Sequence, residues 1–530
     1  MSNLYHTRLH KLDDVNNYSL LTNIQRGIEK EGLRVTPLAK LAQTSHPKAL
    51  GSALTHGSIT TDYSEALLEF ITPVFKQVDD CIDYLELLHR FTQRNIGEEY
   101  LWPSSMPCRL EGENSIPIAK YGHSNLGQMK HIYRQGLAHR YGRIMQSIAG
   151  VHYNFSMPEA FWPLAQTLWG DLGELQAFRS ERYFGLIRNF HRHSWLLSYL
   201  FGASPVLDTS FVADKPHNLN LIGEHTLGLP FATSLRMSDL GYKSEAQASI
   251  KVSLNNLDTY LDNLDQAIHK SYPAYEQIGI QVNGEYRQLN TNILQIENEY
   301  YSDIRPKCVM SPGEKPNQVL KERGVEYIEV RVLDINPFLP LGIDAQQIRF
   351  LDTFLLFCLL SDSPEITAIE DKEIKTNLRL VIEEGRKPSL ILQNAGEPIA
   401  FQQMARQLLD ELMPVAELLD KAHKVSSLNG ESGETQEYRD AISAQQDKIF
   451  QSSLTPSARI MQSITQGEGF TKQMLTQAKQ HKQHLSQQAL SESEKTLFQN
   501  LARESLQKQQ ALELNEENPF EHFLKTYFVA

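Results

Sequence analysis

The chain has 530 residues, of which 41% are hydrophobic and 22% are charged. This composition is typical of a globular protein with a large core, and the length allows about three or four ordinary domains or one large enzyme domain. The 64 acidic and 51 basic side chains give a net charge of −13, which argues against a dedicated nucleic-acid binder because such proteins present basic surfaces. ATP binding is compatible with this charge, since divalent metals bridge carboxylates to phosphates.

The four cysteines are far apart and form no CxxC pair, which excludes a disulfide scaffold and a cysteine-rich zinc site. This usage fits a reducing cytosol, and the polar N-terminus lacks the apolar stretch of a signal peptide. The longest strongly apolar run, 354–360, is too short to cross a bilayer. We therefore expect a cytoplasmic protein without a membrane partner, and the sequence is compatible with a monomer.

Hydrophobic periodicity predicts mixed helices and strands along the first two thirds of the chain. In chain order we expect a lead-in with helical character (1–23), strands (24–35 and 65–72), helices (74–95 and 129–150), a strand (151–156), mostly helix (159–200), loops (201–240), a helix (246–272), a hairpin turning at Asn283-Gly284 (279–289), strands (293–300 and 327–333) and a helix (345–360).

The pattern changes after about Pro364. An amphipathic helix is predicted at 402–423, a Gly/Ser/Glu loop at 428–434 and exposed helices within the Gln- and Lys-rich segment 474–514. The predicted architecture is α+β, with an antiparallel sheet surrounded by helices in residues 1–390 and a helical C-terminal region, 391–530, packed on it.

Three predicted strands carry polar or ionisable side chains two residues apart, which places them on one face because strand side chains alternate. These pairs are Glu29 with Glu31, His152 with Asn154, and Glu329 with Arg331. A further carboxylate, Glu69, lies between Leu68 and Phe70, where burying it unpaired is costly. Each segment alone is also compatible with a solvated sheet face, since antiparallel sheets often expose one polar side.

If these strands are neighbours, their carboxylates converge and repel one another, and this repulsion must be offset. Two carboxylates about 5 Å apart repel by roughly 3 kcal/mol at an effective dielectric constant near 20, so four of them oppose convergence by on the order of 20 kcal/mol. Arg331 alone does not offset this repulsion. The pattern therefore predicts bound divalent cations, and oxygen ligands with His152 as the one nitrogen favour Mg²⁺ or Mn²⁺.

Nucleotide-binding loops of the GxxxxGK[ST] and GxGxxG types are absent, as is the HExxH zinc motif. If ATP binds, metals and scattered cations must hold its phosphates. Arg305 and Lys307 are candidates, and Pro306 between them predicts a loop. Further basic and aromatic pairs, Tyr133-Arg134 and Arg140-Tyr141, lie in a predicted helix, and Arg236 and Tyr242 lie in a polar loop; surface charge and turn chemistry remain alternative explanations for these residues.

At these residues the sequence resembles the bacterial glutamate–cysteine ligase (γ-glutamylcysteine synthetase) family. The resemblance covers roughly residues 20–390 and includes IQRGIEKE at 24–31, the segment 59–73, GVHYNFS at 150–156, the segments 200–205 and 232–242, LQIENE at 294–299 and the segment 326–338. The C-terminal region matches more loosely, at Ser457-Ala458-Arg459.

The resemblance implies a glutamine synthetase-like fold, in which an antiparallel sheet forms a funnel lined by metal-binding carboxylates. It implies ATP-dependent ligation of the γ-carboxyl of L-glutamate to the amine of L-cysteine, the first step of glutathione biosynthesis. The implied metal ligands are Glu29, Glu31, Asp62, Glu69, His152 and Glu329. Arg331 would hold glutamate or the transferred phosphoryl group, and the implied substrate-binding residues are Tyr63, Tyr133, Arg134, Arg236, Tyr242 and Tyr301.

Asp62 is also a candidate base for the attacking amine, in competition with its role as a metal ligand. Two other functions remain open. One is ATP-dependent ligation on the same fold with a different amine acceptor. The other is a non-catalytic metal- or nucleotide-sensing protein with a helical interaction tail.

Overall fold

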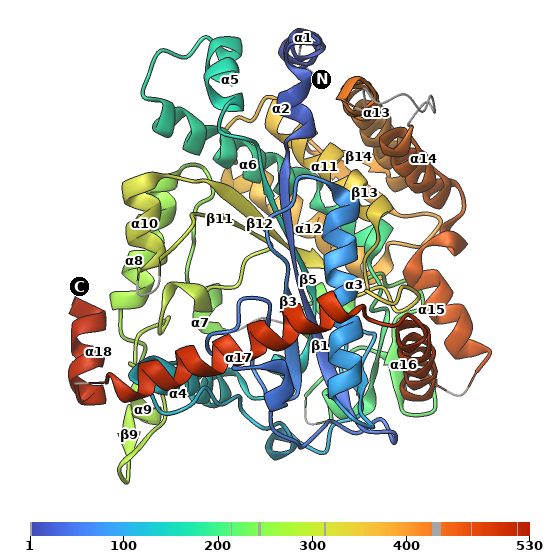
Figure 1. The fold of residues 1–530 in the computed structure, drawn as a ribbon. Helices are drawn as coiled ribbons and strands as arrows, with labels where there is room; N and C mark the ends of the chain where they lie inside the picture. The colour runs from blue at the N-terminus through green and yellow to red at the C-terminus, as the bar shows by residue number, and fades with distance from the viewer. Residues whose placement is uncertain are drawn as a thin grey trace.

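The structure, a computed structural model, describes residues 3–213, 215–241, 245–311, 314–426, 436–467, 469–516 and 518–529. Its centre is a seven-stranded sheet (Figure 1), in which all strand pairs are antiparallel and the order is β11-β12-β5-β1-β3-β2, with β4 pairing with β1. The strands are β1 (Gln25–Val35), β2 (Ile59–Thr61), β3 (Leu67–Ile71), β4 (Tyr100–Leu101), β5 (Val151–Ser156), β11 (Ile304–Lys307) and β12 (Tyr327–Leu333).

One face of this sheet forms the core of the molecule. The alternating apolar side chains of β5 and β12 are buried: Val151, Tyr153, Phe155, Ile328, Val330 and Val332. Helix α6 (Leu175–Phe201) packs against β11 and β12, α3 (Val78–Asn95) packs against β1 and β3, and α11 (Ala345–Leu360) packs on both helices. The opposite face of the strands is therefore left for polar side chains.

A buried ion pair fixes the first strand of the sheet to the helical layer. Arg26 of β1 contacts Asp352 of α11 at 2.9 Å, with side chains that are 1% and 0% exposed. The Tyr153 hydroxyl of β5 donates a hydrogen bond to the same carboxylate at 2.5 Å. A buried charge is tolerated when it is paired and hydrogen-bonded, so this arrangement joins β1, β5 and α11 in a single geometry.

Helices cover the rest of the molecule. α13 (Phe401–Ser426) packs against α14 (Glu437–Phe450), α11 and α2 (Tyr18–Thr22), and α16 (Phe470–Gln487) packs against α3. α17 (Glu492–Leu514) begins with a capping box formed by Ser491 and Glu494. It crosses in front of the sheet and leads to α18 (Phe520–Val529), which packs against α4 (Asn125–Tyr141) (Figure 1). The boundary at residue 390 stays a prediction.

The remaining elements lie around this frame. They are α1 (Asn3–Leu12), α5 (Phe161–Trp169), α7 (Glu245–Ala248), α8 (Leu257–His269), α9 (Pro273–Ile278), α10 (Pro316–Arg323), α12 (Ala368–Glu384), α15 (Pro456–Thr465), β6 (Val206–Asp208), β7 (Asn220–Gly223), β8 (Thr226–Gly228), β9 (Gln281–Val282), β10 (Glu285–Tyr286), β13 (Ile391–Asn394) and β14 (Glu397–Ala400). Among the described residues, no helix combines the length and the apolar character needed to cross a membrane.

Several predicted elements are confirmed. The helix at 345–360 has the predicted limits, the helices in the 74–95 and 402–423 segments form, and the hairpin around Asn283-Gly284 forms between β9 and β10. The strands at 24–35, 65–72, 151–156 and 327–333 also form, and they assemble into the predicted antiparallel sheet. The predicted loop at 428–434 lies outside the described residues.

Five predictions of local structure are wrong. The helix expected at 246–272 is interrupted, because α7 ends at Ala248 and the next helix, α8, begins only at Leu257, where Asn256 caps it. The helix expected at 129–150 ends at Tyr141, because Gly142 adopts a φ of 81°. The segment 293–300 is not a strand but contains a 3₁₀ turn, Glu297–Glu299. The expected loops at 201–240 include the three-stranded sheet β6-β8-β7. Arg305 and Lys307 lie on the edge strand β11, where Pro306 is tolerated, and not on a loop.

Candidate active site

Strand register brings the predicted acidic residues together on the polar face of the sheet. Glu29 of β1 lies opposite His152 of β5, and Glu31 lies opposite Glu69 of β3. On the other side of β5, Asn154 lies opposite Glu329 of β12. Four consecutive strands thus contribute these side chains, and their spacing of two residues along β1 and β5 keeps them on the same face.

Lys30, between the two acids of β1, projects to the opposite face of the sheet. It is buried there, with its Nζ 5.8 Å from the centre of the Phe70 ring. The alternation of β1 therefore separates the cation from Glu29 and Glu31, and Lys30 is not part of the polar cluster.

Three of the side chains form a compact set of possible metal ligands. His152 Nδ1 lies 3.2 Å from Glu29 Oε2 and 3.5 Å from Glu329 Oε1, and its Nε2 lies 3.7 Å from Glu31 Oε1. Ligand atoms of Glu29, His152 and Glu329 all lie within 4.8 Å of one another. Glu329 Oε2 is buried and accepts no hydrogen bond from the described residues. This donor set is mostly carboxylate oxygen and includes one buried oxygen that accepts no hydrogen bond from the described residues, which fits a divalent cation.

Acidic groups crowd one end of the cluster. Burial, followed by the charges of Glu29, Asp62 and Glu31, raises the pKa of Glu69 well above its usual value. Burial also raises the pKa of Glu31. Neighbouring negative charges disfavour the ionised form of a carboxylate, so a bound cation would lower the pKa of both Glu31 and Glu69.

Cationic side chains surround the other end, at Glu329. Although burial acts in the opposite direction, Lys307 and Arg331 hold the pKa of Glu329 well below its usual value. Arg331 Nη1 lies 2.9 Å from Glu329 Oε1, and Lys307 Nζ lies 3.5 Å from its Oε2. Arg305 faces Glu329 in the β11–β12 register. The site is therefore polarised, with acids at one end and three cations around a single carboxylate at the other.

A cavity of about 440 Å³ lies over this face of the sheet. Its lining includes thirteen of the fifteen residues predicted from the sequence: Glu29, Glu31, Asp62, Tyr63, Glu69, Tyr133, Arg134, His152, Tyr301, Arg305, Lys307, Glu329 and Arg331. Arg236 lies beside the cavity and not in its lining; its Nη2 donates to the Arg331 carbonyl at 2.9 Å, and its Nη1 lies 3.7 Å from Asp334. Tyr242 lies outside the described residues.

The backbone at the end of β2 is held by two side chains. Arg134 Nε donates to the carbonyl of Asp62, and the Tyr121 hydroxyl donates to the same carbonyl at 2.9 Å. The Arg134 guanidinium also lies 4.6 Å from the centre of the Tyr121 ring. Tyr121 was not predicted from the sequence. Together the two side chains fix the turn from which the Asp62 carboxylate enters the cavity.

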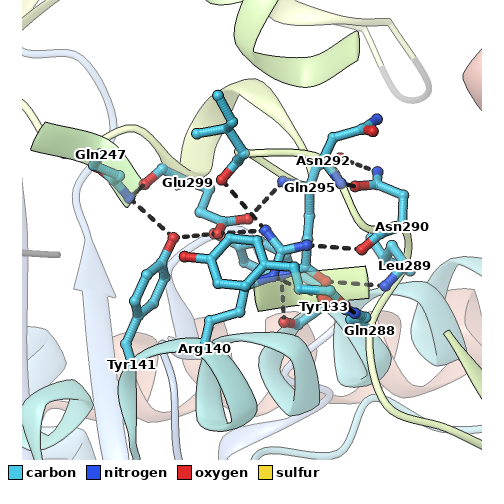
Figure 2. A network of polar contacts seen from close by, with 12 residues as sticks. Tyr133, Arg140, Tyr141, Gln247, Gln288, Leu289, Asn290, Asn292, Gln295 and Glu299 are labelled. Atoms are coloured by element: carbon cyan, nitrogen blue, oxygen red, sulfur yellow. Dashed lines mark hydrogen bonds and ion pairs between the residues drawn. The ribbon is translucent and has the colours of Figure 1, made fainter. Parts of the chain in front are cut away.

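A network of polar contacts that the sequence did not reveal supports the cavity wall (Figure 2). Arg140 of α4 and Glu299 form an ion pair of 3.0 Å in which both side chains are 0% exposed. The Tyr141 hydroxyl donates to Glu299 Oε1 at 2.6 Å, and the Gln295 backbone N–H donates to Glu299 Oε2 at 2.7 Å. Arg140 also donates to Gln288 Oε1 at 3.0 Å.

This network extends to two tyrosines of the cavity lining. Gln295 Nε2 donates to the Tyr133 carbonyl at 3.1 Å, and Gln247 Oε1 accepts from the Tyr301 backbone N–H at 2.9 Å. Gln247 in turn donates to the Glu299 carbonyl at 2.8 Å. The signal available in the sequence was Arg140-Tyr141, noted as a basic and aromatic pair, but nothing in the sequence indicated that Glu299 was its partner.

Comparison with known proteins places this architecture in a family. The family model described as glutamate-cysteine ligase matches residues 9–381. The glutamate–cysteine ligase of Pseudomonas fluorescens is 50% identical over 99% of this chain and 97% of its own length, and that of Alcanivorax borkumensis is 49% identical over 98% of both.

Solved structures agree with the sequence comparison. A crystal structure of the glutamate–cysteine ligase of Francisella tularensis in complex with AMP has a TM-score of 0.88 and 37% identity, and covers 96% of this chain and 97% of that chain. A bifunctional glutathione synthetase from Pasteurella multocida shares the fold, with a TM-score of 0.72, 24% identity and coverage of 93% of this chain and 58% of that chain. The chain belongs to the glutamate–cysteine ligase family, which confirms the resemblance found in the sequence.

Proposed function

We propose that this protein joins the γ-carboxyl of L-glutamate to the amine of L-cysteine through a γ-glutamyl phosphate, with ATP as the phosphoryl donor. The observation that carries the proposal is the single cavity in which Glu29, His152 and Glu329 meet beside Arg305 and Arg331. Phosphoryl transfer needs positioned metal ligands and cations more than covalent chemistry from the protein. The AMP bound to the Francisella relative supports a nucleotide site in this family.

Six residues would hold Mg²⁺ or Mn²⁺, and we propose that the sheet face carrying them is the wall of a metal-lined funnel. The set is Glu29, Glu31, Asp62, Glu69, His152 and Glu329. Bound metal ions would neutralise the charge of the ATP phosphates. The raised pKa of Glu69, caused by burial and the neighbouring acids, supports this assignment because it marks an uncompensated concentration of negative charge.

Arg331 would hold the oxygen atoms of the glutamate carboxyl or of the transferred phosphoryl group. Its Nη1 is paired with Glu329, while its Nε has no hydrogen-bond partner among the described residues. A guanidinium has a planar fork that matches pairs of oxygen atoms. Arg305 and Lys307, from the adjoining strand, would contact the other phosphates.

The ligation takes two steps. The γ-carboxylate oxygen of glutamate attacks the γ-phosphorus of ATP, and ADP leaves. The neutral cysteine amine then attacks the acyl carbon, the bond to phosphate breaks, and the amine proton passes to a base. Asp62 would accept that proton, since its backbone is fixed by Arg134 and Tyr121 at the edge of the cavity. Tyr63, Tyr133 and Tyr301 would line the cysteine side.

We also propose a cytoplasmic location. The four cysteines of the chain are Cys81, Cys108, Cys308 and Cys358, and all are free and buried. Free thiols are typical of a reducing compartment.

The deciding experiment measures ADP formation with glutamate and cysteine, each omitted in turn. We expect ADP release to require both amino acids. A panel of other amines tests the alternative acceptor, and absence of ADP release with every substrate set would leave only a sensing role. With ATP and Mg²⁺ but no cysteine, a sulfoximine analogue of the tetrahedral adduct should become phosphorylated and inactivate the enzyme. Reversible inhibition that does not need ATP would contradict the acyl-phosphate route.

A further inference from the structure

Helix α18 lies far along the chain from the sheet and outside the residues 9–381 that the family model matches. It nevertheless packs against α4, the helix that carries Tyr133 and Arg134 (Figure 1). Its buried Leu524 joins Met129 and Ile132 of α4 in a hydrophobic cluster separate from the main core. The side chains that pack on this cluster from α18 are Phe520, Phe523, Tyr527 and Phe528.

Polar contacts fix the segment before α18 to the beginning of α4. Glu516 accepts from both the backbone N–H and the Nδ2 of Asn125 at 2.6 Å. Asn125 Nδ2 also donates to the Asn518 carbonyl at 2.8 Å, and Glu513 accepts from the His123 backbone N–H at 2.9 Å. Carboxylates are stabilised at a helix N-terminus, where unpaired N–H groups and the helix dipole meet them. These contacts at the beginning of α4 therefore determine where α18 lies along that helix.

This docking brings one side chain of α18, Tyr527, into the lining of the catalytic cavity. The ring is half-buried, and Lys315 Nζ lies 5.2 Å from its centre. Burial raises the pKa of Tyr527 to about 12, so the phenol stays neutral at physiological pH. Its hydroxyl makes no hydrogen bond to any residue that the structure describes. The ring of Tyr527 thus faces the cavity, and its hydroxyl is not held by any residue that the structure describes.

The neighbours of Tyr527 indicate which substrate it meets. Met310 and Pro316, next to Lys315, line the cavity together with Arg305 and Lys307, and the same four residues also line a smaller adjoining cavity. These four residues therefore lie close together, so that the cations of β11 are beside the apolar side chains of Met310 and Pro316. A nucleotide likewise joins charged phosphates to a flat base.

We propose that α18 completes the nucleotide side of the active site and that the base of ATP packs on the ring of Tyr527. This inference rests on the proposed function, which places the phosphates of ATP at Arg305 and Lys307 and so sets the direction in which the base lies. Tyr527 is then a nucleotide-contacting residue supplied by the C-terminal helical region to a site whose metal ligands come from the sheet. Stacking of a base on an aromatic side chain depends on the ring and not on the hydroxyl.

The test compares Tyr527→Ala with Tyr527→Phe, measuring KM for ATP, glutamate and cysteine separately. We expect Tyr527→Ala to raise KM for ATP about tenfold, in line with the loss of one stacked base, and to leave KM for both amino acids within about twofold. Tyr527→Phe should have the same KM for ATP as the parent protein. Lys525→Ala, an exposed change on the same helix, is the matched control and should leave all three KM values unchanged.

A second variant and a binding measurement separate the possible failures. Leu524→Glu, which undocks α18 from α4, should raise KM for ATP as Tyr527→Ala does, with the main thermal unfolding transition retained. Calorimetric titration with ADP tests the contact even in a protein without ligase activity, so loss of the proposed function and loss of this inference are distinguishable. An unchanged ADP affinity and KM for ATP in Tyr527→Ala, or an increase confined to KM for cysteine, would overturn the inference.

Discussion

Arg140 and Glu299 form an ion pair in which neither side chain is exposed, in the polar network that also includes Tyr141 and Gln295 (Figure 2). Both carboxylate oxygens of Glu299 are used, by Arg140 and Tyr141 on one side and by the Gln295 backbone on the other. A buried pair of this kind is stable only while complete, because removing one partner leaves an uncompensated charge in a medium of low dielectric constant. The wall that carries Tyr133 therefore depends on an intact Arg140–Glu299 pair.

Glu299→Gln should destabilise the protein by about 3–5 kcal/mol, since Arg140 loses its counter-charge. Urea unfolding followed by circular dichroism measures the change in the free energy of unfolding. The control is Asp371→Asn, which breaks the exposed pair between Asp371 and Lys375 and should cost no more than about 0.5 kcal/mol. Equal effects of the two substitutions would show that the buried pair does not hold the wall.

Glu329→Gln tests the metal site. We expect the affinity for Mn²⁺, measured by electron paramagnetic resonance titration, to fall at least about tenfold, and turnover to fall with it, because a carboxylate ligand is lost. The parent protein should gain thermal stability on addition of Mg²⁺, and the variant should gain less. Glu322→Gln, an exposed acid on α10, is the control. A variant that fails to fold even with metal would instead assign Glu329 a structural role.

Asp62→Asn separates the two roles proposed for that carboxylate. If Asp62 is chiefly a metal ligand, raising the Mg²⁺ concentration should restore turnover. If it is the base for the cysteine amine, turnover should stay low at saturating Mg²⁺ and rise with pH as free amine becomes available. The measurement is kcat as a function of Mg²⁺ at several pH values. Full turnover with unchanged metal dependence would exclude both roles.

We predict that the protein loses stability in mild acid because His56 becomes protonated. Its Nδ1 accepts backbone hydrogen bonds from Ser58 at 3.0 Å and Ile59 at 2.9 Å, and burial followed by Lys508 lowers its pKa from 6.5 to about 4. Between these pH values the unfolded chain binds a proton that the folded protein does not. The stability contribution is therefore complete above pH 6.5 and is lost as the pH falls towards 4, by about 2 kcal/mol after allowance for solvent screening.

His56→Asn keeps an acceptor near the Nδ1 position but does not titrate. Urea unfolding at a series of pH values from 7 to 4 should therefore show a shallower decline for this variant than for the parent. The exposed His269→Asn is the control and should follow the parent curve. Parallel curves for His56→Asn and the parent would contradict the assignment.

The sheet and its acidic face were predictable because the relevant information is local. Glu29 with Glu31 and His152 with Asn154 follow the two-residue period of a strand, and the apolar residues between them identify the buried face. The periodicity did not show that these strands are neighbours; only the family resemblance implied it, and register pairs such as Glu29 with His152 then appear in the structure. Roles of individual residues in binding and catalysis stay predictions.

The parts of the fold and of the site that were not predicted depend on tertiary contacts, which leave no periodic pattern in the sequence. The segment 293–300 alternates like a strand, but it does not pair with one among the described residues. The backbone N–H groups of Ile293 and Leu294 donate to the Lys270 and Ala267 carbonyls, and that of Gln295 donates to the Glu299 side chain. Tyr527 gave no signal either, because only the docking of α18 brings it to the cavity. Sequence reasoning located the floor of the site but not the parts of its walls that come from distant helices.

The position of β5 between β1 and β12 has a consequence for the order in which the sheet can form. β12 is the last strand of the main sheet to be synthesised, and it carries Glu329 to a place beside Glu29 of the first strand. Pairing between segments so distant in sequence forms late, since the loop that it closes is long. The proposed cation site needs ligands from both Glu29 and Glu329. It is therefore complete only after β12 has joined the sheet, and earlier stages of folding proceed without it.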